Sequence, residues 1–302
     1  MSAQGTVPLE SARLAAYSEQ VPCYICSGEN AYDAELCRHC SAPMALALQS
    51  DRGRPPHLVA AIGATGAGKT VYLGMLTDML SRRNDQLHLL ARGAFSITLQ
   101  QTTIGALAKC DFPDKTPNEP DRWNWMHCQI AGRSRSQPLE LIMPDMAGES
   151  LIQEVDHPHS YPVIRQFLSR CWGVQLLIDA ARLYEGGQEQ DFFTMKLLSY
   201  LCELDPHPKR GWGRRPIALV FTKADQCEDC FDDPEAFAKQ WAPGLHRLCL
   251  ERLKRYRFFA AGVAGACAHR WAFGRRVTVP LRIEPRGIVE PFQWLLKEMG
   301  HK

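Results

Sequence analysis

The sequence lacks long hydrophobic runs, and neither sign of charge dominates it. No stretch of about 18 consecutive apolar residues occurs, so a transmembrane helix is not expected. The N-terminus has no basic segment followed by an apolar run, so a secretion signal is not expected either. The 35 basic residues nearly balance the 33 acidic residues, and the net charge of +2 favours neither nucleic acid nor a membrane surface as a partner. Because neither a transmembrane helix nor a secretion signal is expected, we expect a cytoplasmic protein. The net charge does not indicate which class of partner it binds.

Internal repeats and low-complexity tracts are also missing. The 302 residues, 45% hydrophobic and 23% charged, can fill one large core and a small additional unit. Of the twelve cysteines, four form two tight pairs near the N-terminus, and most of the others occur singly. This distribution favours a metal site together with reduced, buried thiols over a disulfide framework.

The first candidate site consists of four cysteines in two Cys-x-x-Cys pairs that are separated by ten residues: Cys23, Cys26, Cys37 and Cys40. Four thiolates suit one tetrahedral, structural Zn²⁺ with no open coordination position. Residues 20–44 contain too few apolar side chains for a core, so metal binding is expected to provide folding free energy on the order of 10 kcal/mol. His39, inside the second pair, could replace a ligand. A redox pair or chance spacing is the alternative.

Changes in composition divide the chain into four parts. A tail (1–20), a zinc ribbon (21–45) and a linker (46–56) precede a large domain (57–302). In this domain buried-strand patterns alternate with helical ones, which predicts an α/β fold with a mainly parallel sheet in a three-layer sandwich. We expect strands at 57–62, 173–178, 216–221 and 258–263, an antiparallel hairpin at 123–131 and 139–143, helices at 69–80, 191–204 and 234–256, and a loop at 111–122.

Residues 63–70 read Gly-Ala-Thr-Gly-Ala-Gly-Lys-Thr and match GxxxxGK[ST] between an expected strand and an expected helix. Glycines let the backbone curl around a phosphate, and N–H groups at the helix N-terminus attract the anion. Lys69 is expected to reach the β- and γ-phosphates, and the Thr70 hydroxyl to bind Mg²⁺. A chance glycine-rich turn is the alternative. The candidate nucleotide-binding residues here are Gly63, Ala64, Thr65, Gly66, Ala67, Gly68, Lys69, Thr70 and Val71.

A second motif, Asp145-Met-Ala-Gly148, follows the expected strand at 139–143. The Asp145 carboxylate can hold a Mg²⁺-bound water. The Gly148 N–H can contact a γ-phosphate and is released when that phosphate leaves. Asp and Gly are also ordinary turn residues, so the motif alone is weak. It indicates a nucleotide site only together with the other motifs.

A third motif, Thr222-Lys-Ala-Asp225, ends the expected strand at 216–221. The Asp225 carboxylate can accept hydrogen bonds from the ring N–H and the amino group of guanine, a donor pair that adenine lacks. Lys223 is expected to pack its stem on the base. A charged helix start is the alternative. A small-residue turn at 260–265 follows the next strand, so the motifs arrive in the order expected for guanine binding.

Together the motifs resemble those of the Ras-like P-loop GTPases. Gly-Ala-Gly-Lys-Thr-Val-Tyr-Leu, Asp-Met-Ala-Gly-Glu, Phe-Thr-Lys-Ala-Asp and the C-terminal segment 282–292 look most like the bacterial double-GTPase group. The resemblance covers about residues 57–298 and implies a sheet with one antiparallel edge strand, Mg²⁺-GTP as the ligand and a multi-component bacterial system. It also implies phosphate contacts from Gly66, Gly68, Lys69 and Thr70, γ-phosphate and Mg²⁺ sensing at Asp145 and Gly148, and base contacts from Thr222, Lys223, Asp225 and the backbone of Ala261 or Gly262.

One departure concerns catalysis, because Glu149 stands where many Ras-like proteins have a water-orienting Gln. Glu149 can orient the water or accept its proton, but a carboxylate beside a γ-phosphate is unfavourable, and capping of the next helix is the alternative. The candidate catalytic residues are Lys69, Thr70, Asp145, Gly148 and Glu149. Spacing does not decide which threonine between the first two motifs is the switch threonine. The candidates are Thr98, Thr102, Thr103 and Thr116. Four loop arginines could stabilise charge or simply be solvated: Arg133, Arg135, Arg214 and Arg215.

The sequence thus predicts a Mg²⁺-dependent GTP-binding switch that hydrolyses GTP slowly to GDP and binds a protein partner through the ribbon and the switch segments. A non-hydrolysing module is the first alternative, favoured by Glu149. An ATPase or kinase is the second and requires the third motif to be accidental. A nucleic-acid-binding ribbon is the third, with a sparse basic set of Arg13, Arg38, Arg52 and Arg54. Two further pairs are interpreted as loop residues and not as metal ligands: Cys227 with Cys230 and His157 with His159.

Overall fold

The computed structural model of the chain describes residues 20–49, 56–82, 87–132, 138–205, 211–272 and 274–300. The expected tail up to residue 19, linker residues 50–55 and five arginines considered above lie outside these residues: Arg13, Arg52, Arg54, Arg133 and Arg135. None of the described helices combines the length and the apolar character that crossing a bilayer requires.

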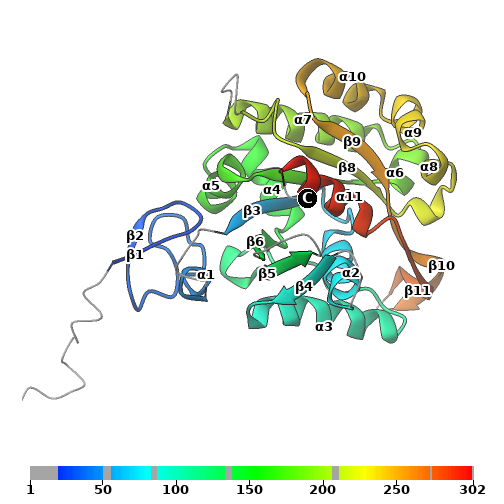
Figure 1. Ribbon diagram of the computed structural model, residues 1–302. Coiled ribbons are helices and arrows are strands. Elements are labelled where there is room, and N and C mark those ends of the chain that lie inside the picture. Colours follow the sequence, from blue (N-terminus) through cyan, green and yellow to red (C-terminus); the bar gives the residue numbers. More distant parts are fainter. Residues whose placement is uncertain are drawn as a thin grey trace, which may run out of the picture.

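A seven-stranded sheet forms the centre of the molecule (Figure 1). Its strands follow the order β4 (Leu87–Ala91), β5 (Trp125–Gly132), β6 (Leu139–Pro144), β3 (His57–Gly63), β7 (Gly173–Asp179), β8 (Ile217–Thr222) and β9 (Tyr256–Ala260). The neighbours from β6 to β9 are parallel, whereas β5 runs antiparallel to both β4 and β6. The predicted α/β fold with a mainly parallel sheet is therefore confirmed, and so is the predicted hairpin.

Helices cover both faces of the sheet and make three layers. One face carries α2 (Lys69–Ser81), α3 (Ala94–Ala108) and α11 (Val289–Glu298). The other face carries α4 (Gly148–Asp156), α5 (Pro162–Arg170), α7 (Gln188–Leu204), α9 (Pro234–Trp241) and α10 (Pro243–Arg252). Each face has its own apolar cluster, because side chains alternate along a strand: Val59 joins one cluster while Leu58 and Ala60 join the other.

Two predicted elements need correction. The single helix expected at 234–256 is two helices, because the Pro243 ring cannot continue α9 and instead starts α10 at its first turn. The strand expected at 258–263 ends at Ala260. From Gly262 the chain leaves the sheet and builds a hairpin of its own, β10 (Gly262–Ala272) with β11 (Arg275–Arg286).

The resemblance implies an antiparallel strand at the sheet edge, and this too is corrected. Strand β5 is the antiparallel strand, but β4 pairs outside it. Strand β4 and helix α3 are not expected from the sequence. Helix α3 shows no clear pattern because two of its four buried residues carry hydroxyls: Ser96 and Thr103, beside Leu99 and Leu107. No apolar stripe marks such a helix.

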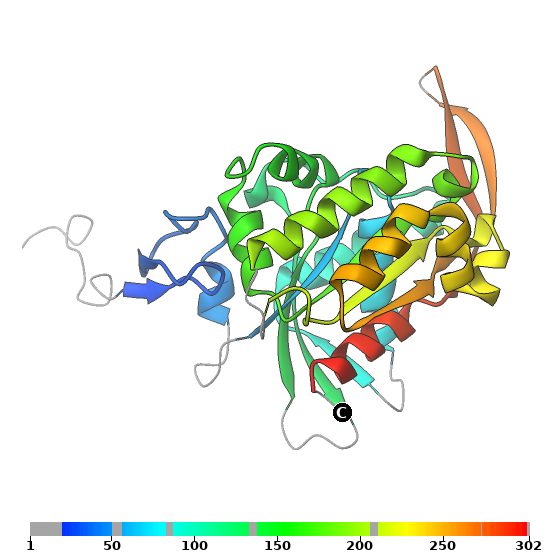
Figure 2. The same ribbon diagram turned by 90° about the horizontal axis from the view of Figure 1, so that it is seen from above.

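The N-terminal segment 20–49, called the ribbon from here on, packs on the sheet and its helices (Figure 1). Its strands β1 (Gln20–Pro22) and β2 (Glu29–Ala31) are antiparallel, and α1 (Ala45–Gln49) follows them. Ile25 and Met44 are buried in the same apolar cluster as Phe167 of α5, and Arg170 Nη1 donates to the Ile25 carbonyl at 3.1 Å. Figure 2 shows the β10–β11 hairpin projecting from the opposite end of the molecule.

Candidate functional site

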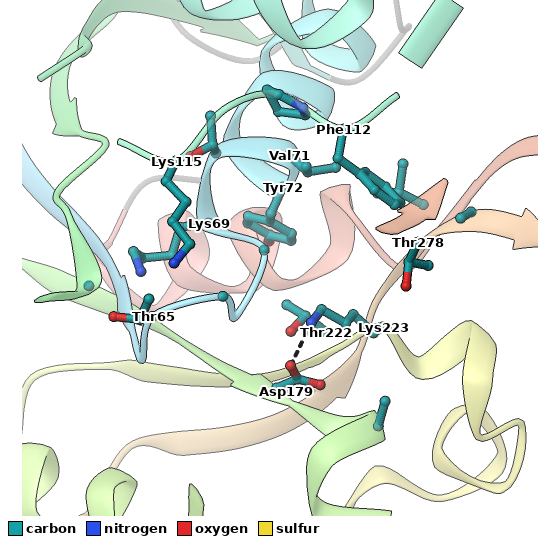
Figure 3. Close-up of a pocket in the computed structure, with 18 of the residues that line it drawn as sticks. Thr65, Lys69, Val71, Tyr72, Phe112, Lys115, Asp179, Thr222, Lys223 and Thr278 are labelled. Atoms are coloured by element: carbon teal, nitrogen blue, oxygen red, sulfur yellow. Dashed lines mark hydrogen bonds and ion pairs between the residues drawn. The ribbon is translucent and has the colours of Figure 1, made fainter. Parts of the chain in front are cut away.

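A cavity of about 680 Å³ lies where the parallel strands end. It is lined by the loop after β3, by residues that follow β7, β8 and β9, and by the loop at 112–118. Figure 3 shows Lys69 on one side of it, facing Lys223 and Asp179 on the other. Ligands of open α/β sheets bind at the carboxyl ends of the strands, so this position is the expected one for a site.

The loop between β3 and α2 forms the floor of the cavity. Gly66 and Gly68 both have φ +78°, a left-handed conformation that favours glycine, and α2 begins directly after them at Lys69. Lys69 is 7% exposed, and its ammonium donates to the carbonyls of Gly63 and Ala64, at 3.0 Å each. Burial lowers the pKa of Lys69 to about 8. A buried cation beside a helix N-terminus is an electrostatic site for an anion.

Most of the candidate residues of this loop face the cavity. Those that line it are Thr65, Gly66, Gly68, Lys69, Thr70 and Val71. The other three candidates do not line the cavity: Gly63, Ala64 and Ala67. The Ala67 carbonyl accepts a hydrogen bond from Thr222 Oγ1 at 2.8 Å. The loop at 63–70, called the phosphate loop from here on, is thus in direct contact with the third motif.

Three oxygen-bearing side chains converge beneath the cavity. Asp145 Oδ2 accepts from Thr70 Oγ1 at 2.9 Å and from Thr116 Oγ1 at 2.8 Å, and the two hydroxyl oxygens are 3.1 Å apart. Burial raises the pKa of Asp145, while the bonds from Thr116 and Thr70 oppose that rise. Asp145 Oδ1 is buried without a hydrogen-bond partner. An unsatisfied carboxylate oxygen next to two hydroxyls is a donor set that fits Mg²⁺.

The structure therefore singles out Thr116 among the four possible switch threonines. Thr98 and Thr102 are exposed on α3, and Thr103 packs against Gly74 of α2. Of these four candidates only Thr116, in the loop at 111–122, bonds to Asp145, a placement that spacing along the sequence cannot reveal.

Gly148 and Glu149 join that loop to the floor. A Cβ on Gly148 would lie 2.6 Å from the Thr65 nitrogen, so only glycine allows this approach. Glu149 accepts from Asn118 Nδ2 at 3.2 Å and lies 3.7 Å from Lys115 Nζ. Glu149 lies in the first turn of α4, and its carboxylate faces Lys115 and Asn118 of the loop.

The other end of the cavity is built by the third motif. Lys223 has φ +56° and forms an ion pair of 2.6 Å with Asp179, while the Ala224 N–H donates to the Ala261 carbonyl. A Cβ on Gly262 would lie 2.6 Å from Asp225 Oδ1, so the carboxylate and the turn after β9 are in contact. Burial raises the pKa of Asp225. Thr222, Lys223, Asp225, Ala261 and Gly262 all line the cavity.

Sequence patterns do not identify several cavity residues. These are Asp179 at the end of β7, Arg182 in the helix that follows it, Phe112 and Lys115 in the loop, and Cys267, His269 and Thr278 of the hairpin. A charged residue directly after the apolar run of β7 is the one local signal for Asp179. Conversely, Arg214 and Arg215 do not line the cavity, and Arg215 donates to the carbonyls of Ser169 and Cys171 at 2.9 Å. Their suggested role at the site is wrong.

Cys227 and Cys230 are buried beside the third motif, and Cys230 lies in the short helix α8 (Asp229–Asp232). The loop interpretation of this pair is corrected to packing in the core. His157 and His159 lie in the turn between α4 and α5, as expected.

A second candidate site lies in the ribbon. The Sγ atoms of Cys23, Cys26, Cys37 and Cys40 all lie within 4.8 Å of one another. The Sγ pairs Cys23–Cys40 and Cys26–Cys37 are 3.8 and 3.5 Å apart, close to the roughly 3.8 Å edge of a tetrahedron with Zn–S bonds of about 2.3 Å. Backbone N–H groups of Ile25, Gly28 and His39 point at these sulfurs, as they do toward thiolates. The cluster of four cysteines is compatible with zinc, and His39 does not belong to it.

Comparison with known proteins adds a family to this geometry. The model of the family described as Double-GTPase 2 matches residues 57–262. No curated protein matches the sequence. Among solved structures, the nucleolar GTP-binding protein 1 of Plasmodium falciparum is similar over 70% of this chain and 79% of that chain, with 12% identity and a TM-score of 0.37.

Proposed function

This chain belongs to the Double-GTPase 2 family, and we propose that it is a Mg²⁺-dependent GTP-binding switch that hydrolyses GTP to GDP. One observation carries the proposal: three motifs that are far apart in the sequence meet around a single cavity, with Thr70, Thr116 and Asp145 bonded to one another. A chance match of any one motif would not bring all three together.

The phosphates are assigned to the floor of the cavity. The backbone N–H groups of residues 65–71 surround them, and Lys69 exchanges its bonds to the Gly63 and Ala64 carbonyls for bonds to β- and γ-oxygens. Thr70, Thr116 and Asp145 hold Mg²⁺, which neutralises charge on the same oxygens. Gly148 donates its N–H to the γ-phosphate from its place against Thr65.

Glu149 is assigned to the attacking water. Its carboxylate lies at the cavity wall between Lys115 and Asn118, whose donors offset the negative charge that would otherwise be unfavourable beside a phosphate. The same contacts join the loop at 112–118 to the start of α4. Loss of the γ-phosphate therefore releases both segments together, which is the change that a protein partner reads.

The base is assigned to Asp225, with Lys223 on its face and the backbone of Ala261 and Gly262 beside it. Zn²⁺ is assigned to the four cysteines of the ribbon (21–45), which we treat as a unit that adjoins the GTPase domain (57–302). Partner binding by the ribbon and the switch segments, action in the cytoplasm and membership of a multi-component bacterial system complete the proposal.

Base identity is the sharpest test of the nucleotide. Asp225→Asn sets an NH₂ against a guanine donor, and we expect GTP binding to weaken by roughly 2–4 kcal/mol. Xanthine offers a carbonyl at that position, so the variant is expected to prefer XTP. The measurement is competition of GTP, XTP and ATP against a fluorescent GTP analogue. Asp229→Asn, an exposed carboxylate of α8, is the matched control. A native protein that ranks ATP first contradicts the proposal.

A non-hydrolysing binding module is a second candidate, because Glu149 replaces the usual amide. Single-turnover incubation separates the two functions: the module leaves bound GTP intact, whereas the GTPase releases inorganic phosphate.

A further inference from the structure

Arg182 is the only arginine among the described residues that line the cavity. It belongs to the short helix α6 (Ala180–Tyr184), which follows β7 directly. Its Nη1 donates to the Thr65 carbonyl at 3.4 Å, and a Cβ on Gly66 would lie 3.3 Å from its Nη2. The guanidinium therefore lies against the backbone of the phosphate loop.

This part of the loop is its γ-phosphate end, if the proposed function holds. Gly148, the residue assigned to the γ-phosphate, approaches the nitrogen of Thr65, and Arg182 approaches the carbonyl of the same residue. The two groups thus reach Thr65 from different elements. A γ-phosphate bonded to Gly148 would therefore lie beside the residue that the Arg182 guanidinium already contacts.

Asp179 holds the backbone of Arg182, but its carboxylate pairs more closely with Lys223 than with the Arg182 guanidinium. Asp179 Oδ1 caps α6 by accepting from the Arg182 N–H at 3.2 Å. Asp179 Oδ2 is 2.6 Å from Lys223 Nζ but 3.5 Å from Arg182 Nε, so the lysine is its closer partner. The Asp179 side chain is 1% exposed and that of Arg182 is 57% exposed. The backbone of Arg182 is thus held by a buried carboxylate, while its guanidinium makes only the longer contacts to Asp179 and Thr65 and is largely exposed to solvent.

We propose that Arg182 is a catalytic residue that acts within its own chain. When GTP binds, its guanidinium moves from the Thr65 carbonyl to the γ-phosphate and to the oxygen that bridges the β- and γ-phosphates. Water oxygen bonds to the γ-phosphorus as the bond to the bridging oxygen breaks, and GDP leaves with that electron pair while the water protons stay on the phosphate and solvent. Arg182 transfers no proton. It donates hydrogen bonds to oxygens that gain charge.

The experiment compares Arg182→Ala and Arg182→Lys with the native chain. Arg247→Ala, an exposed arginine of α10 that does not line the cavity, is the control. We expect Arg182→Ala to lower the single-turnover rate of GTP hydrolysis by on the order of 10²- to 10³-fold and the control to leave it unchanged. Affinities for GTP and GDP and the unfolding temperature are expected to stay close to those of the native chain.

Two further measurements separate catalysis from a structural role. Binding of aluminium fluoride to the GDP complex, which mimics the transferring phosphoryl group, is expected to be lost in Arg182→Ala, and added guanidinium ion is expected to restore part of the rate. A rate equal to that of the native chain overturns the inference. A fall in GTP affinity together with the unfolding temperature, without rescue, also overturns it, because Arg182 then only supports Asp179.

The outcome for the proposed function is read separately. If the native chain binds no GTP, the proposed function fails and the assignment of Arg182 fails with it. If the native chain binds GTP and hydrolyses none, binding stands and Arg182 has no step to accelerate. If hydrolysis occurs and Arg182→Ala does not slow it, only the inference fails.

Discussion

The ribbon and the P-loop domain differ in what holds them together. The ribbon has two strands of only three residues each, and three of its four clustered cysteines are themselves among its buried residues. In the domain, a seven-stranded sheet lies between two apolar clusters. A metal ion would therefore determine whether the ribbon is folded, whereas a nucleotide would alter a domain that apolar burial already holds together.

The two regions are nevertheless in contact. Ile25 and Met44 share an apolar cluster with Phe167, and Arg170 bonds to the ribbon backbone. None of the described ribbon residues lines the cavity. The contact is thus one of packing, and the following three changes test how far it couples the two regions.

Loss of zinc is expected to have the largest effect. Cys37→Ser removes one of four ligands, and we expect it to abolish binding of one Zn²⁺ per chain and to unfold residues 20–45, since metal binding contributes on the order of 10 kcal/mol in such modules. Elemental analysis and limited proteolysis measure both. GTP affinity, measured with excess Mg²⁺, is expected to stay nearly intact.

Cys110→Ser, at an exposed cysteine after α3, is the matched control. Native protein purified without chelator that carries no zinc contradicts the metal assignment. A large fall in GTP affinity in Cys37→Ser shows that the two regions form one cooperative unit.

The second change lies in the P-loop domain and is expected to leave its fold intact. Lys69→Ala removes the buried ammonium that is assigned to the β- and γ-phosphates, and GTP affinity is expected to fall well over tenfold, more than about 1.4 kcal/mol. The unfolding temperature is expected to stay the same or rise, because a buried charge whose pKa is lowered to about 8 is removed.

Calorimetric titration and thermal unfolding measure the two effects. Lys297→Ala, at an exposed lysine in the last turn of α11, serves as the control. Affinity unchanged in Lys69→Ala means that the phosphates bind elsewhere.

The third and smallest effect concerns the contact between the regions. Arg170→Ala deletes the donor to the Ile25 carbonyl, and we expect a loss of about 1 kcal/mol or less in protection of ribbon amides from hydrogen exchange. Gln166→Ala, an exposed residue on the same helix, is the comparison. Equal protection in the two variants assigns the contact to apolar burial alone.

Features encoded locally could be predicted from the sequence. The phosphate loop requires glycine at φ +78° and a helix that starts at Lys69, so the motif and its surroundings specify the structure. The four cysteines are likewise predictable, because each pair forms a tight turn of the chain. The predicted strands lie close to their observed positions, since buried parallel strands are nearly continuous apolar runs.

Features that depend on long-range contacts could not be predicted. Thr116 reaches Asp145 only because the loop at 111–122 folds over the cavity, and no spacing rule distinguishes it from Thr98 on α3. The Arg182 side chain is positioned by contacts with Asp179 and with the phosphate loop. That loop lies more than a hundred residues earlier in the chain, so no local pattern reveals the contact. Helix α3 is hidden because hydroxyl side chains fill half of its buried face.

The point at which the β10–β11 hairpin joins the sheet has an evolutionary consequence. The chain departs after Ala260 and comes back at Gly287, whose φ is +66° and where a Cβ would overlap the Ala260 carbonyl. Departure and return are therefore almost the same point, so the insert could be shortened, lengthened or exchanged without shifting the register of any sheet strand. Cys267, His269 and Thr278 line the cavity from this insert, while the phosphate loop lies outside it. Replacement of the insert would therefore change side chains at the mouth of the pocket and leave those of the phosphate loop in place.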